Sequence, residues 1–449
     1  MAIFKRKIYS RLLQWKENGG KTALLIEGAR RIGKSTIART FAENEYDSYV
    51  LIDFSIAPRE VIELFDNIAN LNEFFTRLQF EFGISLTPRK SLIIFDEVQF
   101  CPRARQAIKH LVADGRFDYL ETGSLISIRK NVKDILIPSE EERIDMYPLD
   151  YEEFRWAMGD TATCNLLREA LCAGRPLGDA LNRKLMRDFR LYMLVGGMPQ
   201  AINEYLDSLD LMKVDEVKRG IISLYEADFR KIDSYGRMGR LFNNIPGQLA
   251  NGAKRYMPHT VLGNTSPDVE SALIAELADS KTVQLCHHAA DPAGGLSISV
   301  DKDYFKIYLT DTGLFITLAF KDKQFTDNII YNKLLSDKLR ANLGFVYENA
   351  VAQILSSAGH RLFYYTFPTE NRHSCEIDFL LGSGDKIDPI EVKSSSYRSH
   401  VSLDRFCDKY SAKVRTPLVI YTKDMAKEGT IRYIPIYMLP FLVEQSRNS

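Results

Sequence analysis

The sequence of 449 residues has no excess charge of either sign and no long apolar run. Its 59 basic side chains balance 59 acidic ones, so any site for a polyanion has to be a local patch. No apolar run reaches the roughly 20 residues of a transmembrane helix. The opening MAIFKRKIYSRLLQWKENGG lacks the apolar core of a secretion signal. We therefore expect neither membrane insertion nor secretion.

Cysteine is also scarce, and its spacing excludes two further classes of protein. The six cysteines form no C-x-x-C pair and have no zinc-ligand spacing, which argues against a disulfide scaffold and a zinc site. Free thiols are typical of a reducing compartment, so we predict a cytoplasmic location. We expect His287, His288 and His400 to be ordinary surface or core histidines rather than metal ligands.

Short apolar segments alternate with helical patterns up to about residue 150. Four segments, TALLIEG, YVLIDFS, SLIIFDE and FDYLETGS, are mostly apolar, as buried parallel strands are. This alternation predicts an α/β domain with a parallel sheet over residues 1–150.

The rest of the chain divides into three regions. Residues 151–235 have helical periodicity, and residues 236–335 have short helices followed by alternating segments, as in a winged helix. Residues 336–449 contain a helix, three strands, a second helix and a further strand, which predicts a smaller C-terminal α/β domain.

The segment GARRIGKS is a complete G-x-x-x-x-G-K-[ST] phosphate-binding pattern, placed between a predicted strand and a predicted helix. Its glycines let the backbone wrap around phosphates, and the helix N-terminus adds partial positive charge. Lys34 is expected to reach the β- and γ-phosphates, and Ser35 to ligate Mg²⁺. The predicted nucleotide-binding residues are Gly28, Ala29, Arg30, Arg31, Ile32, Gly33, Lys34, Ser35 and Thr36.

The segment SLIIFDEVQ supplies the partner acids at the end of a buried strand. We expect Asp96 to hold the Mg²⁺ shell and Glu97 to polarise the attacking water as a general base. An acidic pair favours hydrolysis over mere binding. Because no guanine-reading N-K-x-D follows, the nucleotide is predicted to be ATP.

Two further residues near this site have alternative explanations. Ser124, after the next strand, could sense the γ-phosphate, but ordinary loop chemistry explains a serine there equally well. Arg143 could act as an arginine finger supplied by a neighbouring subunit of a homo-oligomer. A surface salt bridge with the adjacent glutamates explains it as well.

Together these motifs resemble those of a large bacterial and archaeal family of AAA-type ATPases with a C-terminal domain of unknown function. The segments that carry the resemblance are GARRIGKS, LIIFDEVQ, LETGSL, MYPLDYEEF, VGGMPQAINEY, YLTDTGLF, GFVYENAV, EIDFLL and IEVKSS. The resemblance implies an additional-strand P-loop core, a helical and winged-helix middle, and a restriction-nuclease-like C-terminal domain. One position departs from it, since Glu142 precedes Arg143 where the family usually has glycine.

The C-terminal region carries an acid, acid, lysine pattern similar to that of PD-(D/E)xK nucleases. Glu391 and Lys393 are two apart on a predicted strand, so both side chains leave the same face. Asp378 is expected on the preceding strand, beside them in a hairpin. Glu348 is expected on the helix before these strands, placed to complete the metal shell. Two acids sharing Mg²⁺ and a lysine suit phosphodiester hydrolysis. An ion pair between Glu391 and Lys393, kept for packing or binding, is the alternative.

These patterns lead to three hypotheses. In the first, an ATPase couples domain movement to nucleic-acid binding or to Mg²⁺-dependent cleavage by the C-terminal domain. In the second, an ATP-switched regulator uses an inactive nuclease-like domain to bind DNA or a protein partner. In the third, the AAA core remodels proteins. Basic residues of the middle region could lie against a phosphate backbone, or be solvated charges: Lys254, Arg255, Lys302 and Lys306.

Overall fold

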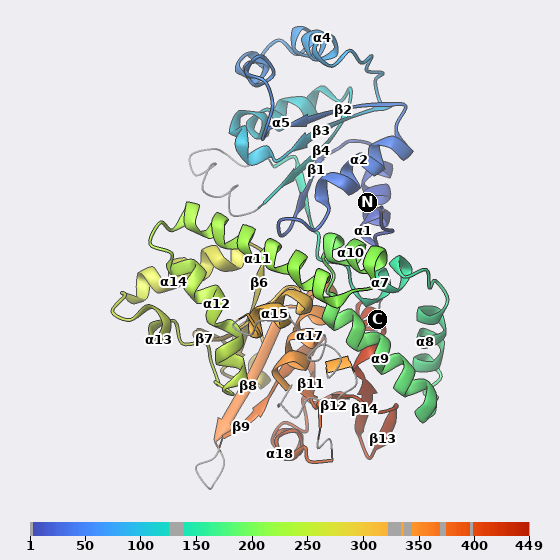
Figure 1. The fold of residues 1–449 in the computed structure, drawn as a ribbon, viewed down its shortest axis with the longest axis vertical. Helices are drawn as coiled ribbons and strands as arrows, with labels where there is room; N and C mark the ends of the chain where they lie inside the picture. Colours follow the sequence, from blue (N-terminus) through green and yellow to red (C-terminus); the bar gives the residue numbers. More distant parts are fainter. Residues whose placement is uncertain are drawn as a thin grey trace. The chain divides into compact units, whose positions relative to one another are not determined.

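The computed structural model describes residues 3–124, 139–321, 334–335, 344–368, 374–395 and 398–448. The chain forms two compact units (Figure 1). The first unit comprises Met1–Tyr147 with Asp279–Lys281, and the second comprises Pro148–Ala278 with Thr282–Ser449. Among the described residues, no helix combines the length and apolar character needed to cross a membrane.

A parallel five-stranded sheet forms the centre of the first unit. Its strands are β1 (Ala23–Glu27), β2 (Ser48–Asp53), β3 (Ser91–Asp96), β4 (Asp118–Gly123) and β5 (Glu141–Asp145). Their order is β2-β3-β4-β1-β5, and every neighbouring pair is parallel. The predicted parallel α/β core is therefore confirmed. Strand β4 lies between β1 and β3, as the additional strand of such a core does.

Strand β5 was not predicted, and its position explains why. It reads EERID, which is too polar for a strand buried on both faces. In the structure it occupies the edge of the sheet beside β1. An edge strand is held by one neighbour and tolerates charged side chains.

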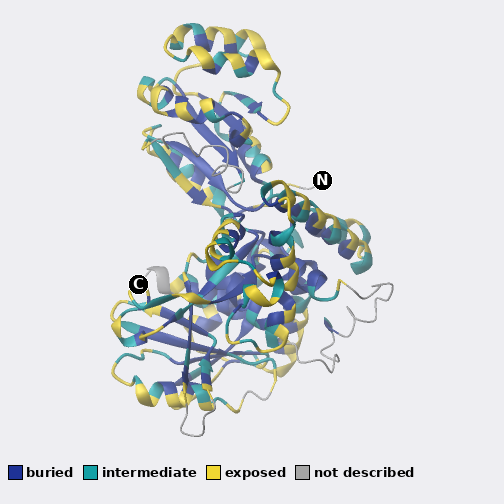
Figure 2. Cartoon of the chain, turned by 90° about the vertical axis from the view of Figure 1, so that its left-hand side faces the viewer, coloured by how far each residue is buried: buried dark blue, intermediate teal, exposed yellow. Residues whose placement is uncertain are grey.

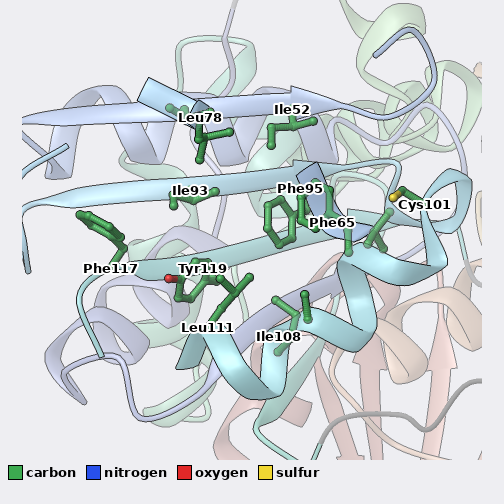
Figure 3. Packing of buried hydrophobic residues seen from close by; sticks show 14 of the residues in the cluster. Ile52, Phe65, Leu78, Ile93, Phe95, Cys101, Ile108, Leu111, Phe117 and Tyr119 are labelled. Carbon is green, nitrogen blue, oxygen red and sulfur yellow. The ribbon is translucent and has the colours of Figure 1, made fainter. Parts of the chain in front are cut away.

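Helices cover this sheet: α1 (Ile8–Glu17), α2 (Lys34–Glu45), α3 (Arg59–Glu63), α4 (Leu71–Phe82) and α5 (Pro102–Asp114). A core of aromatic and aliphatic side chains packs between strands and helices (Figure 3). The ring centroids of Phe65 and Phe95 are 5.5 Å apart. Ile108 and Leu111 of α5 are fully buried. Each such side chain contributes about 1.5–3 kcal/mol to stability, so the strand ends that carry the site have a rigid support.

The second unit begins with five helices: α7 (Tyr151–Ala157), α8 (Thr163–Cys172), α9 (Asp179–Val195), α10 (Pro199–Ser208) and α11 (Leu211–Ile232). Three more follow: α12 (Arg237–Ala250), α13 (Pro258–Leu262) and α14 (Pro267–Asp279). An antiparallel hairpin comes next, formed by β6 (Val283–Ala289) and β7 (Val300–Leu309). Figure 2 shows buried residues concentrated in the strands and on the inner helix faces.

This hairpin belongs to a larger sheet. Strand β6 also pairs in parallel with β8 (Leu362–Pro368), which pairs with β9 (Ser374–Ile377). The sheet order is β7-β6-β8-β9, so the hairpin of the middle region is continuous with C-terminal strands. In sequence order, three helices followed by a hairpin fit a winged helix. In the structure, however, strand β6 of this hairpin also pairs with β8, so the hairpin is part of a larger sheet. The winged helix therefore stays a prediction.

A second sheet in this unit has the order β10-β11-β12-β14-β13. Its strands are β10 (Phe379–Ser383), β11 (Lys386–Val392), β12 (Leu418–Tyr421), β13 (Ala426–Glu428) and β14 (Ile431–Pro435). The unit's remaining long helices are α15 (Thr312–Ala319), α17 (Gly344–Ser357), α18 (Val401–Lys409) and α19 (Leu439–Asn448).

The predicted strand EIDFLLG is interrupted at Asp378, which corrects its expected position on a continuous strand. Residues before it form β9 and residues after it form β10, in different sheets. The Oδ2 atom of Asp378 accepts the N–H of Val392 at 2.7 Å, so a side chain replaces a ladder bond at the break. The expected hairpin with the following strand is present, because β10 and β11 pair antiparallel.

The glycine pair after α9, Gly196 and Gly197, lies close to Gly313 at the start of α15. Gly196 ends α9 with φ 84°, and the N–H of Gly197 donates to Asp311 Oδ2 at 2.6 Å. The buried Lys218 donates to the carbonyls of Leu194 and Gly313 at 2.6 and 3.3 Å. Burial lowers the pKa of Lys218 to about 8, despite nearby Asp215 and Asp311. A buried polar junction therefore joins the end of α9 to the start of α15.

Candidate nucleotide-binding site

The P-loop connects the buried strand β1 to α2, and two glycines permit its path. Gly33 caps α2 with φ 96°, a left-handed conformation that favours glycine. At Gly28, a Cβ would lie 2.3 Å from the carbonyl oxygen of Met146 and 2.6 Å from Ile32 Cδ1. A side chain there would push the loop away from the segment that follows β5.

Lys34 is buried in the first turn of α2 and lies over its own loop. Its Nζ donates to the carbonyls of Gly28 and Ala29, at 3.0 and 2.9 Å. Burial lowers the pKa of Lys34 to about 8, although Glu97 and Asp96 oppose this shift. The ammonium group is thus held at the loop centre by carbonyl oxygens that phosphate oxygens can replace.

Ser35, in the first turn of α2, and Asp96, at the end of β3, meet beside this lysine. Ser35 Oγ donates to Asp96 Oδ1 at 2.8 Å. Thr122 at the end of β4 donates to the same oxygen. Hydroxyl and carboxylate oxygens are the ligands that Mg²⁺ prefers, so this donor set fits the predicted ion. Ser35 and Asp96 are the residues that would hold it.

Glu97 follows β3 in a left-handed conformation, with φ 52°. Its N–H donates to Thr122 Oγ1 at 3.4 Å, and the Gln99 side chain donates to its carboxylate. These contacts fix the orientation of the predicted general base. Ser124 lies just beyond β4, past Gly123.

Thr122 and Gln99 were not predicted as site residues. Both residues lie in segments that the motifs single out, Thr122 in LETGSL and Gln99 in SLIIFDEVQ. Only the sheet order shows that β4 is the neighbour of β3, with Glu121 beside Phe95. That register places the hydroxyl of Thr122 next to Asp96.

Arg143 lies on β5 and is paired within its own unit. Its Nε donates to Glu141 Oε1 at 2.8 Å, and its Nη1 is 3.7 Å from Glu27 Oε1. This arrangement matches the salt-bridge alternative for Arg143. A finger role in a neighbouring subunit stays a prediction.

The same carboxylate anchors a buried ionic cluster under β4 and β5. Arg105 of α5 makes a two-pronged contact with Glu141, at 2.9 and 3.0 Å. Burial, together with Glu141, raises the pKa of Glu121 well above its usual value, which favours the neutral carboxyl. The cluster tethers the edge strand to the sheet.

In the second unit, the C-terminal acids divide into two groups. In the first, Lys306 of β7 pairs with Glu376 and lies 3.8 Å from Glu348. Burial, and next Glu348, raise the pKa of Asp378 well above its ordinary value, while Lys306 opposes them. Tyr308 donates to Glu348 at 3.1 Å. Lys306 was predicted as a possible contact to a phosphate backbone. That prediction is wrong in this structure, because its ammonium group is buried among acids.

The second group is the pair Glu391 and Lys393, with 2.6 Å between Oε1 and Nζ. Burial, Glu428 and, more weakly, Glu391 raise the pKa of Tyr433 to about 12. Asp378 lies near both groups, because its Oδ2 atom accepts the N–H of Val392, the residue after Glu391, at 2.7 Å.

The predicted metal group of Glu348, Asp378 and Glu391 stays a prediction. In the part of the chain that the structure describes, no three His, Cys, Asp or Glu side chains are arranged to hold a metal ion. The chain leaves one sheet for another at Asp378, and each acid group already holds a lysine, Lys306 or Lys393.

Two of the three singled-out histidines have clear hydrogen-bond partners. The Nε2 atom of His288 accepts the N–H of Thr366 at 3.2 Å. His400 lies between Asp404 and Tyr433, at 3.0 and 2.9 Å. Burial lowers the pKa of His287 and of His288, which disfavours the charged imidazolium form of both.

Comparison with known families gives three matches along the chain. Residues 20–155 match a family described as an AAA domain. Residues 186–324 match a domain of unknown function, DUF8612, and residues 343–439 match another, DUF4143.

Individual relatives are distant. An uncharacterized protein of Methanocaldococcus jannaschii is 21% identical over 72% of this chain and 67% of its own length. A Walker-type ATPase of Pyrococcus abyssi shares 18% identity, with a TM-score of 0.43, over 70% of this chain and 96% of that one. The Pif1 helicase of Candida albicans reaches a TM-score of 0.22 at 13% identity, over 41% of this chain and 48% of that one. Similarity at this level transfers no activity. The chain thus combines an AAA-type P-loop ATPase domain with two domains of unknown function.

Proposed function

We propose that the chain binds ATP with Mg²⁺ at its P-loop and hydrolyses the γ-phosphate. The observation that carries this proposal is the 2.8 Å contact between Ser35 Oγ and Asp96 Oδ1, beside the buried Lys34. Side chains that are 61 residues apart supply the two expected magnesium ligands at one point.

In this proposal each residue has one task. Gly28 and Gly33 shape the backbone that faces the phosphates, and Lys34 exchanges its carbonyl partners for β- and γ-phosphate oxygens. Glu97 orients and polarises the attacking water. Bound Mg²⁺ neutralises charge that develops on the phosphates.

Phosphate release and nucleotide binding test these tasks separately. Lys34→Ala should abolish nucleotide binding, because the only ammonium group at the loop is lost. Glu97→Gln should bind ATP as the parent does and lose turnover by about a hundredfold or more. Equal turnover in Glu97→Gln and the parent would remove Glu97 from the base role.

For the second unit we propose that nucleotide-driven movement alters binding of DNA or another partner, with the nuclease-like region as a binding module. The observation that favours binding over cleavage is the internal pairing of both acid groups with Lys306 and Lys393. A metal would have to displace these lysines. Mg²⁺-dependent cleavage is the second candidate, since Asp378, Glu391 and Lys393 are all competent residue types.

A plasmid nicking assay separates the two candidates. Purified parent protein should leave supercoiled plasmid intact with Mg²⁺ or Mn²⁺ if the region only binds. Nicking that disappears in Asp378→Ala and in Lys393→Ala, with ATP turnover retained, would establish cleavage instead.

A further inference from the structure

The P-loop receives a contact from a segment that precedes the residues matched to the AAA domain. This segment is fixed by α1, whose Leu12 and Trp15 are buried. The Trp15 ring lies 6.4 Å from that of Phe41 on α2, and its Nε1 donates to the carbonyl of Thr22 at 2.9 Å. Helix α1 is thus held against the helix that the P-loop opens.

Arg6, just before α1, reaches the loop itself and is only 8% exposed. Its Nη1 donates to the carbonyl of Ile32 at 3.0 Å, and its Nη2 donates to the carbonyl of Tyr147 at 2.6 Å. One guanidinium group therefore joins two backbone oxygens that are far apart in sequence. The planar, forked arrangement of its donors suits this task.

The contact at Ile32 bears directly on phosphate binding. In a planar trans peptide, the carbonyl and the following N–H point in opposite directions. Holding the Ile32 carbonyl on Arg6 therefore directs the N–H of Gly33 away from Arg6. P-loops bind phosphate through backbone N–H groups that face inward, and a carbonyl rotated inward would repel the anion.

The contact at Tyr147 ties the loop to the segment that leaves β5. The N–H of the preceding Met146 donates to the carbonyl of Glu27 at 2.7 Å, and its own carbonyl lies against Gly28. The segment Met146–Tyr147 therefore supports the start of the loop directly, at Glu27 and Gly28. Through Arg6 it also supports the end of the loop, at Ile32.

We propose that Arg6 is a positioning residue that sets the P-loop backbone for phosphate binding. This inference rests on the proposed nucleotide binding. Arg6 does not touch the reacting atoms, and its effect appears as affinity for the phosphate chain rather than as chemistry. Lysine cannot replace it fully, because a single ammonium group lacks the fork that spans both carbonyls.

Calorimetry with Mg²⁺–ATP and Mg²⁺–ADP tests the proposal on the full-length chain. Arg6→Ala should bind both nucleotides about tenfold more weakly, as expected when a charged hydrogen-bond donor is removed. Arg6→Lys should fall between Arg6→Ala and the parent. Arg11→Ala, on an exposed position of α1, is the matched control and should bind as the parent does.

Steady-state turnover adds a readout that a purely structural role would not produce. The KM for ATP should rise about tenfold in Arg6→Ala, while kcat at saturating ATP stays within about threefold of the parent. Parent-like affinity and KM in Arg6→Ala would overturn the inference while leaving parent nucleotide binding, and so the proposed function, intact. A parent protein that binds no nucleotide would overturn both. If Arg6→Ala does not fold, Arg6→Lys is compared with the parent instead. Weaker binding and a higher KM for ATP in Arg6→Lys would support the inference, and parent-like values would overturn it.

Discussion

Lys34 occupies an environment that disfavours its own charge. Its ammonium group is buried, and two carbonyl oxygens replace the water it has lost. The resulting pKa of about 8 places its titration near physiological pH. A triphosphate would add negative charge to that of Glu97 and Asp96 and would favour the ammonium form of Lys34.

Nucleotide affinity should therefore fall as pH rises through 8. In the free protein Lys34 is mostly neutral above that pH. Phosphate oxygens favour the ammonium form, so binding at about pH 8.5 takes up a proton. Calorimetry in two buffers of different ionisation enthalpy measures this uptake. Equal affinity at about pH 7.5 and pH 9, with no proton uptake, would contradict the assignment.

Thr122 should matter for magnesium use although it is not itself an expected ligand. Thr122→Val removes the hydroxyl that orients Asp96, and we expect kcat/KM to drop about tenfold at limiting Mg²⁺. The measurement is ATP turnover against Mg²⁺ concentration. Thr40→Val on α2 is the control, because that hydroxyl has no hydrogen-bond partner within the described structure. Matching losses in the two variants would exclude a specific role for Thr122.

Among the elements, the junction between α9 and α15 depends on close backbone approach. A Cβ on Gly197 would lie 2.2 Å from the carbonyl oxygen of Leu149, and one on Gly313 would lie 2.5 Å from Gly196 Cα. The N–H of Leu149 donates to the carbonyl of Gly197 at 2.8 Å. Relief of either clash requires movement of backbone, which explains why glycine stands at both positions.

Gly197→Ala should lower the free energy of unfolding by about 2 kcal/mol or more, because the methyl group forces the turn away from Leu149. Gly220→Ala on α11, where a Cβ meets nothing within 4 Å, should instead raise it by about 0.5–1 kcal/mol. Denaturant unfolding of the two variants checks the contrast. Equal stability of the two would show that the junction can relax.

Apolar strands and the phosphate loop could be predicted from the sequence because their signals are local. Strands β1 and β3 are strongly apolar, β2 and β4 have apolar centres, and GARRIGKS fixes its own conformation through glycine. Strand β5, the break at Asp378 and the approach of Lys306 to Glu376 depend on contacts between distant segments. Periodicity carries no information on such contacts. The predicted roles of Ser124 as a γ-phosphate sensor and of Arg143 as an arginine finger also depend on such contacts, and they stay predictions.

For the whole chain, the proposal joins an ATPase unit to a second unit that binds a partner. Added DNA should increase ATP turnover by about threefold or more if that partner is nucleic acid, since binding energy can shift a nucleotide-dependent equilibrium. Turnover measured with and without duplex and single-stranded DNA tests this. Unchanged turnover with both would favour a protein partner, and Glu97→Gln controls for contaminating ATPases.

The most direct test of the account is a calorimetric titration of the folded parent protein and Lys34→Ala with ATP in Mg²⁺. We predict saturable binding of one ATP per chain by the parent and none by Lys34→Ala. Absence of heat with both ATP and GTP in the parent, or equal binding by the two proteins, would contradict the claim that this loop grips a triphosphate.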